Sequence, residues 1–215
     1  LLGLALWMAT LSIQMSRVAT GVLVTVALLL GGMSHQQASY WKNDLALFLR
    51  GVEVQPRSAT AHTNLAGVYR LQGDNAQALH HYQTALGLDS KAYIVNYNMA
   101  AIHRQQGNLT AAIDALQASL QSHPGYARSH RLLGQLLDQQ AQAAGLPLPA
   151  AGLEHARRAF EIEPHQYDTA LVYAGALANR GRNPEAARVL SSLMQQGGLT
   201  PGQLQHLENL QRKLR

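Results

Sequence analysis

The chain has 215 residues, of which 47% are hydrophobic and only 13% are charged. It contains no cysteine, which excludes disulfides and thiolate metal sites. The formal net charge is +5, but no run of Lys and Arg exceeds two residues, so we expect no nucleic-acid partner.

The segment of residues 1–36 has the composition of membrane-spanning sequence. Residues 18–36 contain no Asp, Glu, Lys or Arg, and they approach the ~20 residues that a helix needs to cross hydrocarbon. Residues 1–15 are also apolar, and one continuous helix through both stretches would place Arg17 near the middle of the membrane, at a high cost. We therefore predict one complete span at 18–36 and a truncated span at 1–15. A single span, or a buried hairpin in a soluble protein, is the alternative.

The apolar sequence starts at Leu1, without the basic residues that open a signal peptide. This pattern favours the C-terminal part of a longer membrane protein, and a signal anchor that lacks its start is the alternative. Membrane lipid is the expected partner of these N-terminal helices. Residues 37–58 form the predicted junction, in which Tyr40 and Trp41 suit the membrane interface and one helix follows.

A period of 34 residues runs from residue 59 to residue 198. Two series of residues recur at intervals of 34 or 40 positions: Ala66, Ala100, Gly134 and Ala174, and Pro56, Ser90, Pro124, Pro164 and Gly198. The period predicts four units of two helices each, at 59–92, 93–126, 127–166 and 167–198. The third unit has six additional residues between Gly134 and Gly152, where Pro147 and Pro149 prevent a continuous helix.

Each unit resembles the tetratricopeptide repeat, whose pattern sets a large residue, Leu-Gly, Tyr, Gly, Ala, an aromatic residue, Ala and Pro at fixed offsets. The first unit supplies Leu65-Ala66, Tyr69, Gly73, Ala78, Tyr82 and Ala85. The later units supply Met99-Ala100, Gly107, Ala112, Leu116 and Pro124, then Leu133-Gly134, Ala156, Ala159 and Pro164, then Tyr173-Ala174, Gly181, Ala186 and Leu190. The resemblance implies an all-α fold, a solenoid of antiparallel helix pairs, here preceded by one or two transmembrane helices.

Two partial units flank the four repeats. Residues 41–56 match the second half of a repeat and lie within the junction. Residues 199–215 predict a capping helix that begins at Pro201 and is capped by Thr200. This helix presents one apolar stripe, formed by Leu204, Leu207, Leu210 and Leu214.

Nothing in the sequence indicates catalysis or a cofactor. His80 and His81 are adjacent, so on a helix they point about 100° apart and cannot share a metal ion. His62, His103 and His130 fall at positions of the repeat core, where packing is expected rather than metal binding. We therefore expect no catalytic residue, no cofactor and no metal site in this segment.

The repeat resemblance places the candidate site on the concave surface formed by the first helix of each unit. In the family, the position before the Leu-Gly pair faces this groove, and an Asn there can hold a peptide backbone. Asn64 and Asn98 occupy that position, and Leu132 and Val172 replace them in the later units. The same correspondence adds Thr63, Tyr97 and Arg131 one place earlier, Arg70 and Arg104 one turn further on, and Arg128 near the start of its helix.

This groove is expected to be polar and basic in the first three units, and to suit an extended or acidic peptide. The alternative is that the two asparagines only bond neighbouring helices and that the arginines are ordinary solvated charges.

The junction before the first repeat supports a second resemblance. The sequence from residue 18 to residue 69 is similar to the transmembrane-and-tetratricopeptide O-mannosyltransferase-type proteins and their bacterial relatives. That resemblance implies that the segment is the non-catalytic C-terminal part of a multi-span glycosyltransferase-like protein, with its repeats in the periplasm or the reticulum lumen. The alternative is an independent membrane-anchored scaffold or assembly factor for envelope or secretion machinery.

Overall fold

The computed structural model describes residues 44–89 and 92–214. The chain divides into two compact units, Leu1–Pro56 and Arg57–Arg215. All regular secondary structure within the described residues is α-helical, which confirms the all-α part of the predicted fold class. None of these helices is long and apolar enough to cross a membrane. The predicted spans at 1–15 and 18–36 lie outside the described residues and stay predictions.

The described part of the first unit contains one helix, α2 (Asp44–Val54), within the predicted junction at 37–58. Asp44 lies in its first turn, where a carboxylate opposes the positive end of the helix dipole.

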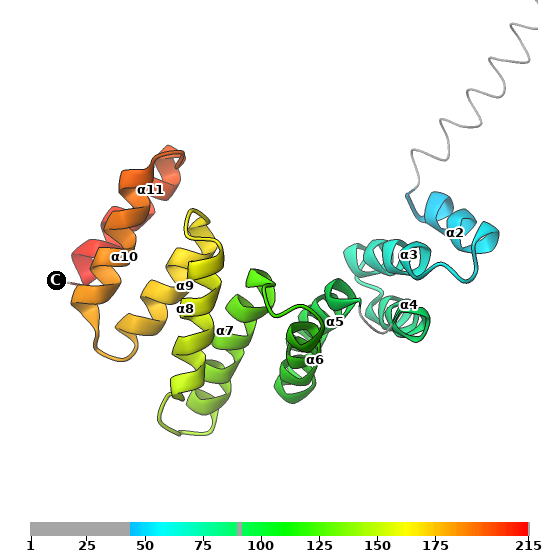
Figure 1. Ribbon diagram of the computed structural model, residues 1–215, viewed down its shortest axis with the longest axis horizontal. Coiled ribbons are helices and arrows are strands. Elements are labelled where there is room, and N and C mark those ends of the chain that lie inside the picture. Colours follow the sequence, from blue (N-terminus) through cyan, green and yellow to red (C-terminus); the bar gives the residue numbers. More distant parts are fainter. Residues whose placement is uncertain (1–43, 90–91, 215) are drawn as a thin grey trace, which may run out of the picture. The chain divides into compact units, whose positions relative to one another are not determined.

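The second unit is a succession of helical hairpins (Figure 1). Its helices are α3 (Ala59–Leu71), α4 (Asn75–Leu88), α5 (Tyr93–Gln105), α6 (Leu109–Ser122), α7 (Ala127–Ala143), α8 (Ala150–Ile162), α9 (Tyr167–Ala178), α10 (Asn183–Gln196) and α11 (Pro201–Lys213). The first helix of each hairpin (helix A: α3, α5, α7 and α9) packs on the second (helix B: α4, α6, α8 and α10). Successive hairpins also pack on one another through α4 and α5, α6 and α7, and α8 and α9, as a solenoid requires.

Glycines end three of the A helices. Gly73, Gly107 and Gly181 have φ values of 81°, 77° and 72°, in the left-handed region that only glycine enters at little cost. In the first hairpin the Asp74 amide then donates to the Tyr69 carbonyl at 2.9 Å, which satisfies a carbonyl at the end of α3. The Asp74 carboxylate caps α4 by accepting from the Gln77 amide.

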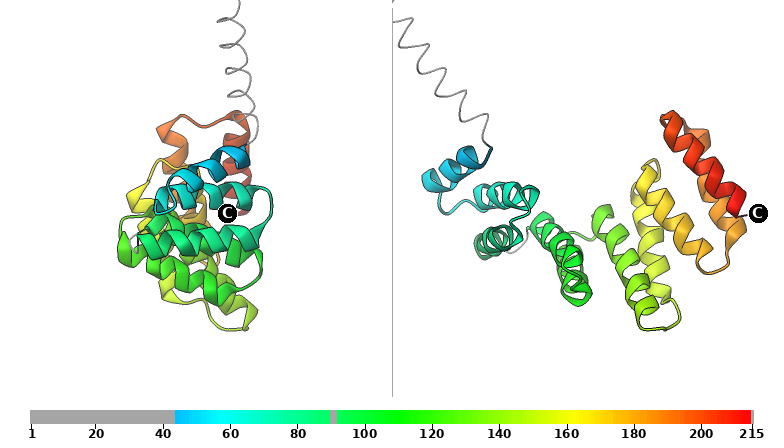
Figure 2. Two further views of the ribbon diagram at one scale, coloured as in Figure 1. Left: turned by 90° about the vertical axis from the view of Figure 1, so that its right-hand side faces the viewer. Right: turned by 180° about the vertical axis from the view of Figure 1, so that it is seen from behind.

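The third hairpin carries the six additional residues. Its A helix, α7, has 17 residues against 13 in α3 and α5, so part of the insertion extends the helix by one turn. The rest forms the loop between Gly145, with φ of 65°, and Pro149, which precedes α8. In the right-hand view of Figure 2, α7 and α8 lie side by side, as they do in Figure 1.

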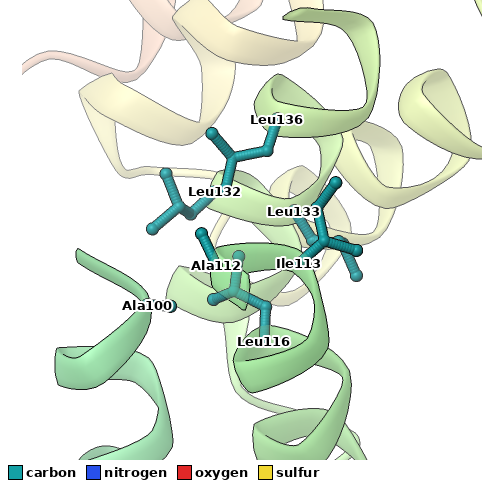
Figure 3. Close-up of a cluster of buried hydrophobic side chains, with 7 residues drawn as sticks. All are labelled: Ala100, Ala112, Ile113, Leu116, Leu132, Leu133 and Leu136. Carbon is teal, nitrogen blue, oxygen red and sulfur yellow. The ribbon is translucent and has the colours of Figure 1, made fainter. Parts of the chain in front are cut away.

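Small and branched apolar side chains fill the contacts between hairpins. In one cluster, Ala100 of α5, Ala112, Ile113 and Leu116 of α6, and Leu132, Leu133 and Leu136 of α7 are all buried (Figure 3). This cluster joins the second repeat to the third, so neither repeat completes its core alone.

The last helix, α11, is held in the same way. Thr200 and Gln203 form a capping box at its start, and Leu207 is fully buried against α9 and α10. The helix therefore covers the apolar face that the fourth repeat would otherwise expose.

Candidate functional site

The A helices of the second, third and fourth hairpins bring charged side chains together in one cavity. This arginine cavity has a volume of about 290 Å³ and is lined by Tyr97, Arg128, Arg131, Glu163, Gln166, Asp168 and Thr169. Three of these residues, Tyr97, Arg128 and Arg131, belong to the predicted groove. The other four come from the end of α8 and the start of α9, and they add two carboxylates to a surface that was expected to be basic.

A second cavity continues along the same helices. This amide cavity has a volume of about 430 Å³ and lies between α7 and α9. Its polar lining includes the side-chain amides of Gln135, Gln139, Gln142 and Asn179. Arg131 and Asp168 line both cavities, so the two cavities adjoin, and we call them together the A-helix groove.

Small residues form the floor of the amide cavity, among them Gly134, Ala156, Gly175 and Ala176. At Gly134, the close approach of α7 and α8 requires a residue without a side chain. A Cβ added to Gly134 would lie 2.7 Å from the carbonyl oxygen of Gly152, closer than real Cβ atoms come to another atom. The helix backbones therefore meet here, and the space above them stays open to a ligand.

A buried ion pair closes one side of the amide cavity. Both terminal nitrogens of the Arg180 guanidinium, Nη1 and Nη2, donate to the carboxylate of Asp138, at 2.8 and 2.7 Å. The same guanidinium donates to the carbonyls of Ala176 and Pro149 at 2.9 and 2.7 Å. Arg180 thus connects α9 to α7 and to the start of α8, and it fixes the wall that Asp138 gives to the cavity.

Arg131 is the polar residue of the groove whose position is most informative. Its side chain is half-buried and lines both cavities. Within the described residues it forms no hydrogen bond or ion pair, whereas Arg157, Arg180 and Arg182 each hold a carboxylate. Its donors are therefore available to a bound molecule.

An aromatic cluster borders the arginine cavity. The rings of Tyr97 and Tyr126 meet edge to face at 5.5 Å, and Tyr93 stacks on His123 at 4.5 Å. Burial raises the pKa of the Tyr126 hydroxyl, and the neighbouring charge of Arg128 partly opposes that shift. Tyr126 therefore stays a neutral hydrogen-bonding group at physiological pH.

The remaining predicted residues do not line these cavities. Thr63 donates its hydroxyl to the Ala59 carbonyl at 2.8 Å, so this donor is used within α3. Asn64 and Arg104 are exposed on α3 and α5. Their roles in ligand binding stay predictions.

Arg70 and Asn98 lie close to the buried hydroxyl of Tyr82 on α4. Burial raises the pKa of this hydroxyl, and the two side chains oppose the shift. None of the described residues forms a hydrogen bond of ordinary geometry with it. The position of Asn98 thus favours the alternative that it only serves contacts between neighbouring helices. Arg70 is half-buried, so it differs from the ordinary solvated charge that this alternative assigned to the arginines.

Nowhere in residues 44–89 and 92–214 do three or more His, Asp or Glu side chains gather as a possible ligand set. Four of the histidines instead pair across helices, His62 with His81 and His130 with His155.

The comparison with protein families decides the identity of the repeats. The tetratricopeptide repeat profile matches residues 45–93, 72–127 and 97–145. Residues 45–145 of this chain carry tetratricopeptide repeats. Such repeats stack into solenoids whose extended concave surfaces bind other proteins, so the second unit is a tetratricopeptide-repeat interaction module.

Two curated proteins match part of the module. The protein O-mannosyl-transferase TMTC1 of Homo sapiens is 37% identical over 73 residues, which is 33% of this chain and 8% of the human protein. TMTC1 of Mus musculus is 37% identical over 65 residues, or 30% of this chain and 7% of the mouse protein. The chain thus matches less than a tenth of the length of these relatives.

Solved structures share the tetratricopeptide fold. A structure of pilF from Pseudomonas aeruginosa has a TM-score of 0.63 at 20% identity, and the likeness covers 86% of each chain. MamA has a TM-score of 0.60 at 17% identity, over 75% of this chain and 91% of MamA. YrrB, a tetratricopeptide-repeat protein with an unusual peptide-binding site, has a TM-score of 0.58 at 22% identity, over 69% of this chain and 74% of YrrB. At these identities the likeness shows the fold alone.

Proposed function

We propose that the tetratricopeptide module binds an extended polypeptide segment along the A-helix groove. The observation that carries the proposal is that the arginine cavity and the amide cavity adjoin, with Arg131 and Asp168 lining both. An extended peptide presents backbone donors and acceptors at regular intervals, and side-chain amides offer both functions. The glutamines of α7 and Asn179 of α9 suit that backbone, while Arg131 suits a carboxylate on the ligand.

The charge pattern sets the kind of segment that fits. The arginine cavity combines Arg128 and Arg131 with Glu163 and Asp168. The two carboxylates would repel a uniformly acidic peptide. The preferred ligand therefore carries an acidic residue near Arg131 within an otherwise polar, uncharged stretch.

Binding to a peptide library displayed on phage or on an array tests this proposal. The full chain is used, kept in mild detergent because residues 1–33 are apolar. Arg131→Ala is expected to weaken binding of a selected peptide about 10-fold or more, because hydrogen bonds to charged groups contribute roughly 1.5–3 kcal/mol. Arg188→Ala, which removes an exposed arginine of α10 that lies outside both cavities, is the matched control.

Equal affinities of the wild type and the Arg131→Ala variant for every selected peptide would refute the groove as the binding site. A loss of equal size with Arg188→Ala would point to net charge rather than to the groove.

The module is tethered to a membrane by residues 1–36 and forms the non-catalytic C-terminal part of a multi-span glycosyltransferase-like protein. Two observations support this part of the proposal: the apolar composition of residues 1–36, and the 37% identity to TMTC1. Recovering the upstream coding sequence tests it. Further predicted spans upstream would support the transferase, whereas a start codon directly before Leu1 would favour the independent scaffold.

The repeats face the periplasm or the reticulum lumen in this proposal. Leu146→Cys places a single thiol on the exposed loop between α7 and α8 of a chain that has no cysteine. A thiol reagent that cannot cross membranes is expected to label it in intact spheroplasts or in inverted reticulum vesicles. Labelling only after the opposite face is exposed would contradict the proposed side.

A further inference from the structure

Two pairs of histidines join helix A to helix B inside their own repeats. In the first repeat, Nδ1 of His62 on α3 lies 3.0 Å from Nδ1 of His81 on α4. In the third repeat, Nδ1 of His130 on α7 lies 2.9 Å from Nδ1 of His155 on α8. The rings are inclined at 30° and 33°, so the two pairs have nearly the same geometry.

The pairs occupy equivalent repeat positions. Each A-helix histidine precedes the Leu-small pair of its repeat by three residues, and each B-helix histidine follows Ala78 or Gly152 by three residues. The second repeat has Asn96 and Ala115 at these positions, and the fourth has Ala170 and Val189. The same contact thus forms twice in one chain, which makes a chance approach of four imidazoles a poor explanation.

The geometry identifies the contact as a hydrogen bond rather than a metal chelate. In the first pair the ring centroids are 5.3 Å apart, which exceeds the nitrogen separation of 3.0 Å by about one ring diameter. The two nitrogens therefore lie nearly on the line that joins the ring centres. The N–H bond of one nitrogen can then point directly at the lone pair of the other. Two ligands of one metal ion would instead aim at a common point to one side of that line.

The third repeat also shows where the proton lies. Nε2 of His130 is 2.9 Å from the carbonyl oxygen of Pro124, which can only accept, so this nitrogen carries hydrogen. A neutral imidazole has one N–H, hence Nδ1 of His130 is an acceptor and Nδ1–H of His155 is the donor. If His155 becomes charged by gaining a proton on Nε2, its Nδ1–H can still donate and the hydrogen bond remains. If His130 becomes charged by gaining a proton on Nδ1, the acceptor is lost and two N–H groups face each other.

The surroundings of the pairs favour the neutral state. Burial, and then the charge of His130, lower the pKa of His155, and Glu154 on the same helix opposes them weakly. Burial, and then the charges of His62 and His80, lower the pKa of His81, whose ring also stacks on Tyr69 from α3. From the neighbouring elements α5 and α9, no described charged group contributes to either shift.

We propose that each histidine pair is a pH-dependent clasp, by which we mean a hydrogen bond that holds helix A to helix B at neutral pH. The bond breaks when both histidines of the pair are positively charged. The direction in which pH changes the stability follows from the linkage between protonation and folding. In the unfolded chain each histidine titrates near pH 6.5, whereas in the folded protein His81 and His155 take up protons only at lower pH. The stabilisation is complete above about pH 6.5 and is lost as the pH falls below it.

The clasp of the third repeat lies beside the A-helix groove. His130 is adjacent in sequence to Arg131, which lines both cavities. Opening this clasp frees α7 from α8 at the point where Arg131 is held, so acidification loosens the groove.

Thermal unfolding of the full chain at pH 7.5 and pH 5.0 tests the clasps. The test variant carries His81→Asn and His155→Asn, because an Asn amide can donate from the position of Nδ1 but does not titrate. The control carries His165→Asn, which removes an exposed histidine that bonds Gln196 outside the pairs. The wild type and the control are expected to lose about 2–4 °C more in Tm per clasp on acidification than the test variant.

Equal losses of Tm in the wild type and the test variant would overturn the proposal. A second measurement does not depend on stability. Long-range nitrogen–proton NMR spectra at pH 7.5 are expected to show His130 protonated on Nε2 alone, and the opposite tautomer would overturn the assignment of donor and acceptor.

Discussion

At the residue scale, Arg180 connects more elements than any other charged side chain described above. From the turn after α9, its guanidinium donates to the carboxylate of Asp138 on α7, to the Pro149 carbonyl before α8 and to the Ala176 carbonyl of α9. The two side chains of the ion pair are only 14% and 11% exposed. A Cβ at Gly152 would overlap the Asp138 carboxylate, so the pair also explains why glycine stands at this position of the third repeat.

Arg180→Ala is therefore expected to destabilise the fold by about 3–5 kcal/mol, because it leaves the Asp138 carboxylate buried without its cation. Denaturant unfolding of the full chain measures the change. Arg182→Ala, which removes an exposed arginine paired with Glu185 three residues away, serves as the control and is expected to have a much smaller effect. Similar losses in the two variants would show that the Asp138–Arg180 contact is not a buried pair in solution.

The register of the repeats in the sequence predicted part of the groove. Tyr97, Arg128 and Arg131 were found because repeat register assigns positions on helix A without any knowledge of tertiary structure. Glu163 and Asp168 were missed because they enter the arginine cavity only through the approach of α9 to α7. The histidine pairs were missed for the same reason, since their members are 19 and 25 residues apart and belong to different helices.

At the element scale, the insertion of the third repeat shapes the groove. The repeat period placed six additional residues between Gly134 and Gly152 but did not divide them between helix and loop, although the Ala and Gln residues that precede Gly145 favour a helix. One further turn of α7 carries Gln142 to the wall of the amide cavity. The insertion thus builds part of the candidate site.

Two glycines of the amide cavity give matched substitutions at this scale. Gly134→Ala is expected to destabilise the module by about 1–3 kcal/mol, because the added methyl group meets the backbone of α8. Gly175→Ala has open space around its Cβ and is expected to be neutral, or stabilising by up to ~1 kcal/mol, through helix propensity. Chemical denaturation of both variants measures the difference. Equal stabilities would contradict the close approach of α7 and α8.

At the scale of the whole molecule, the chain joins an apolar N-terminal segment to a repeat module that lacks a complete core in any single hairpin. Clusters of buried residues cross from the first repeat to the second and from the second to the third, and Leu207 of α11 completes a further cluster with buried residues of α9 and α10. Loss of one hairpin therefore exposes the apolar face of its neighbour, and the groove exists only while at least three hairpins stay stacked.

Side-chain amide NMR spectra of the full chain, recorded in mild detergent with and without a selected peptide, test the central claim most directly. The account predicts that the amide resonances of Gln139, Gln142 and Asn179, which line the groove, shift on binding. Those of Gln83 and Gln117, exposed on the B helices α4 and α6, are predicted to stay in place. Shifts confined to the B-helix residues, with the groove amides unchanged, would contradict the account.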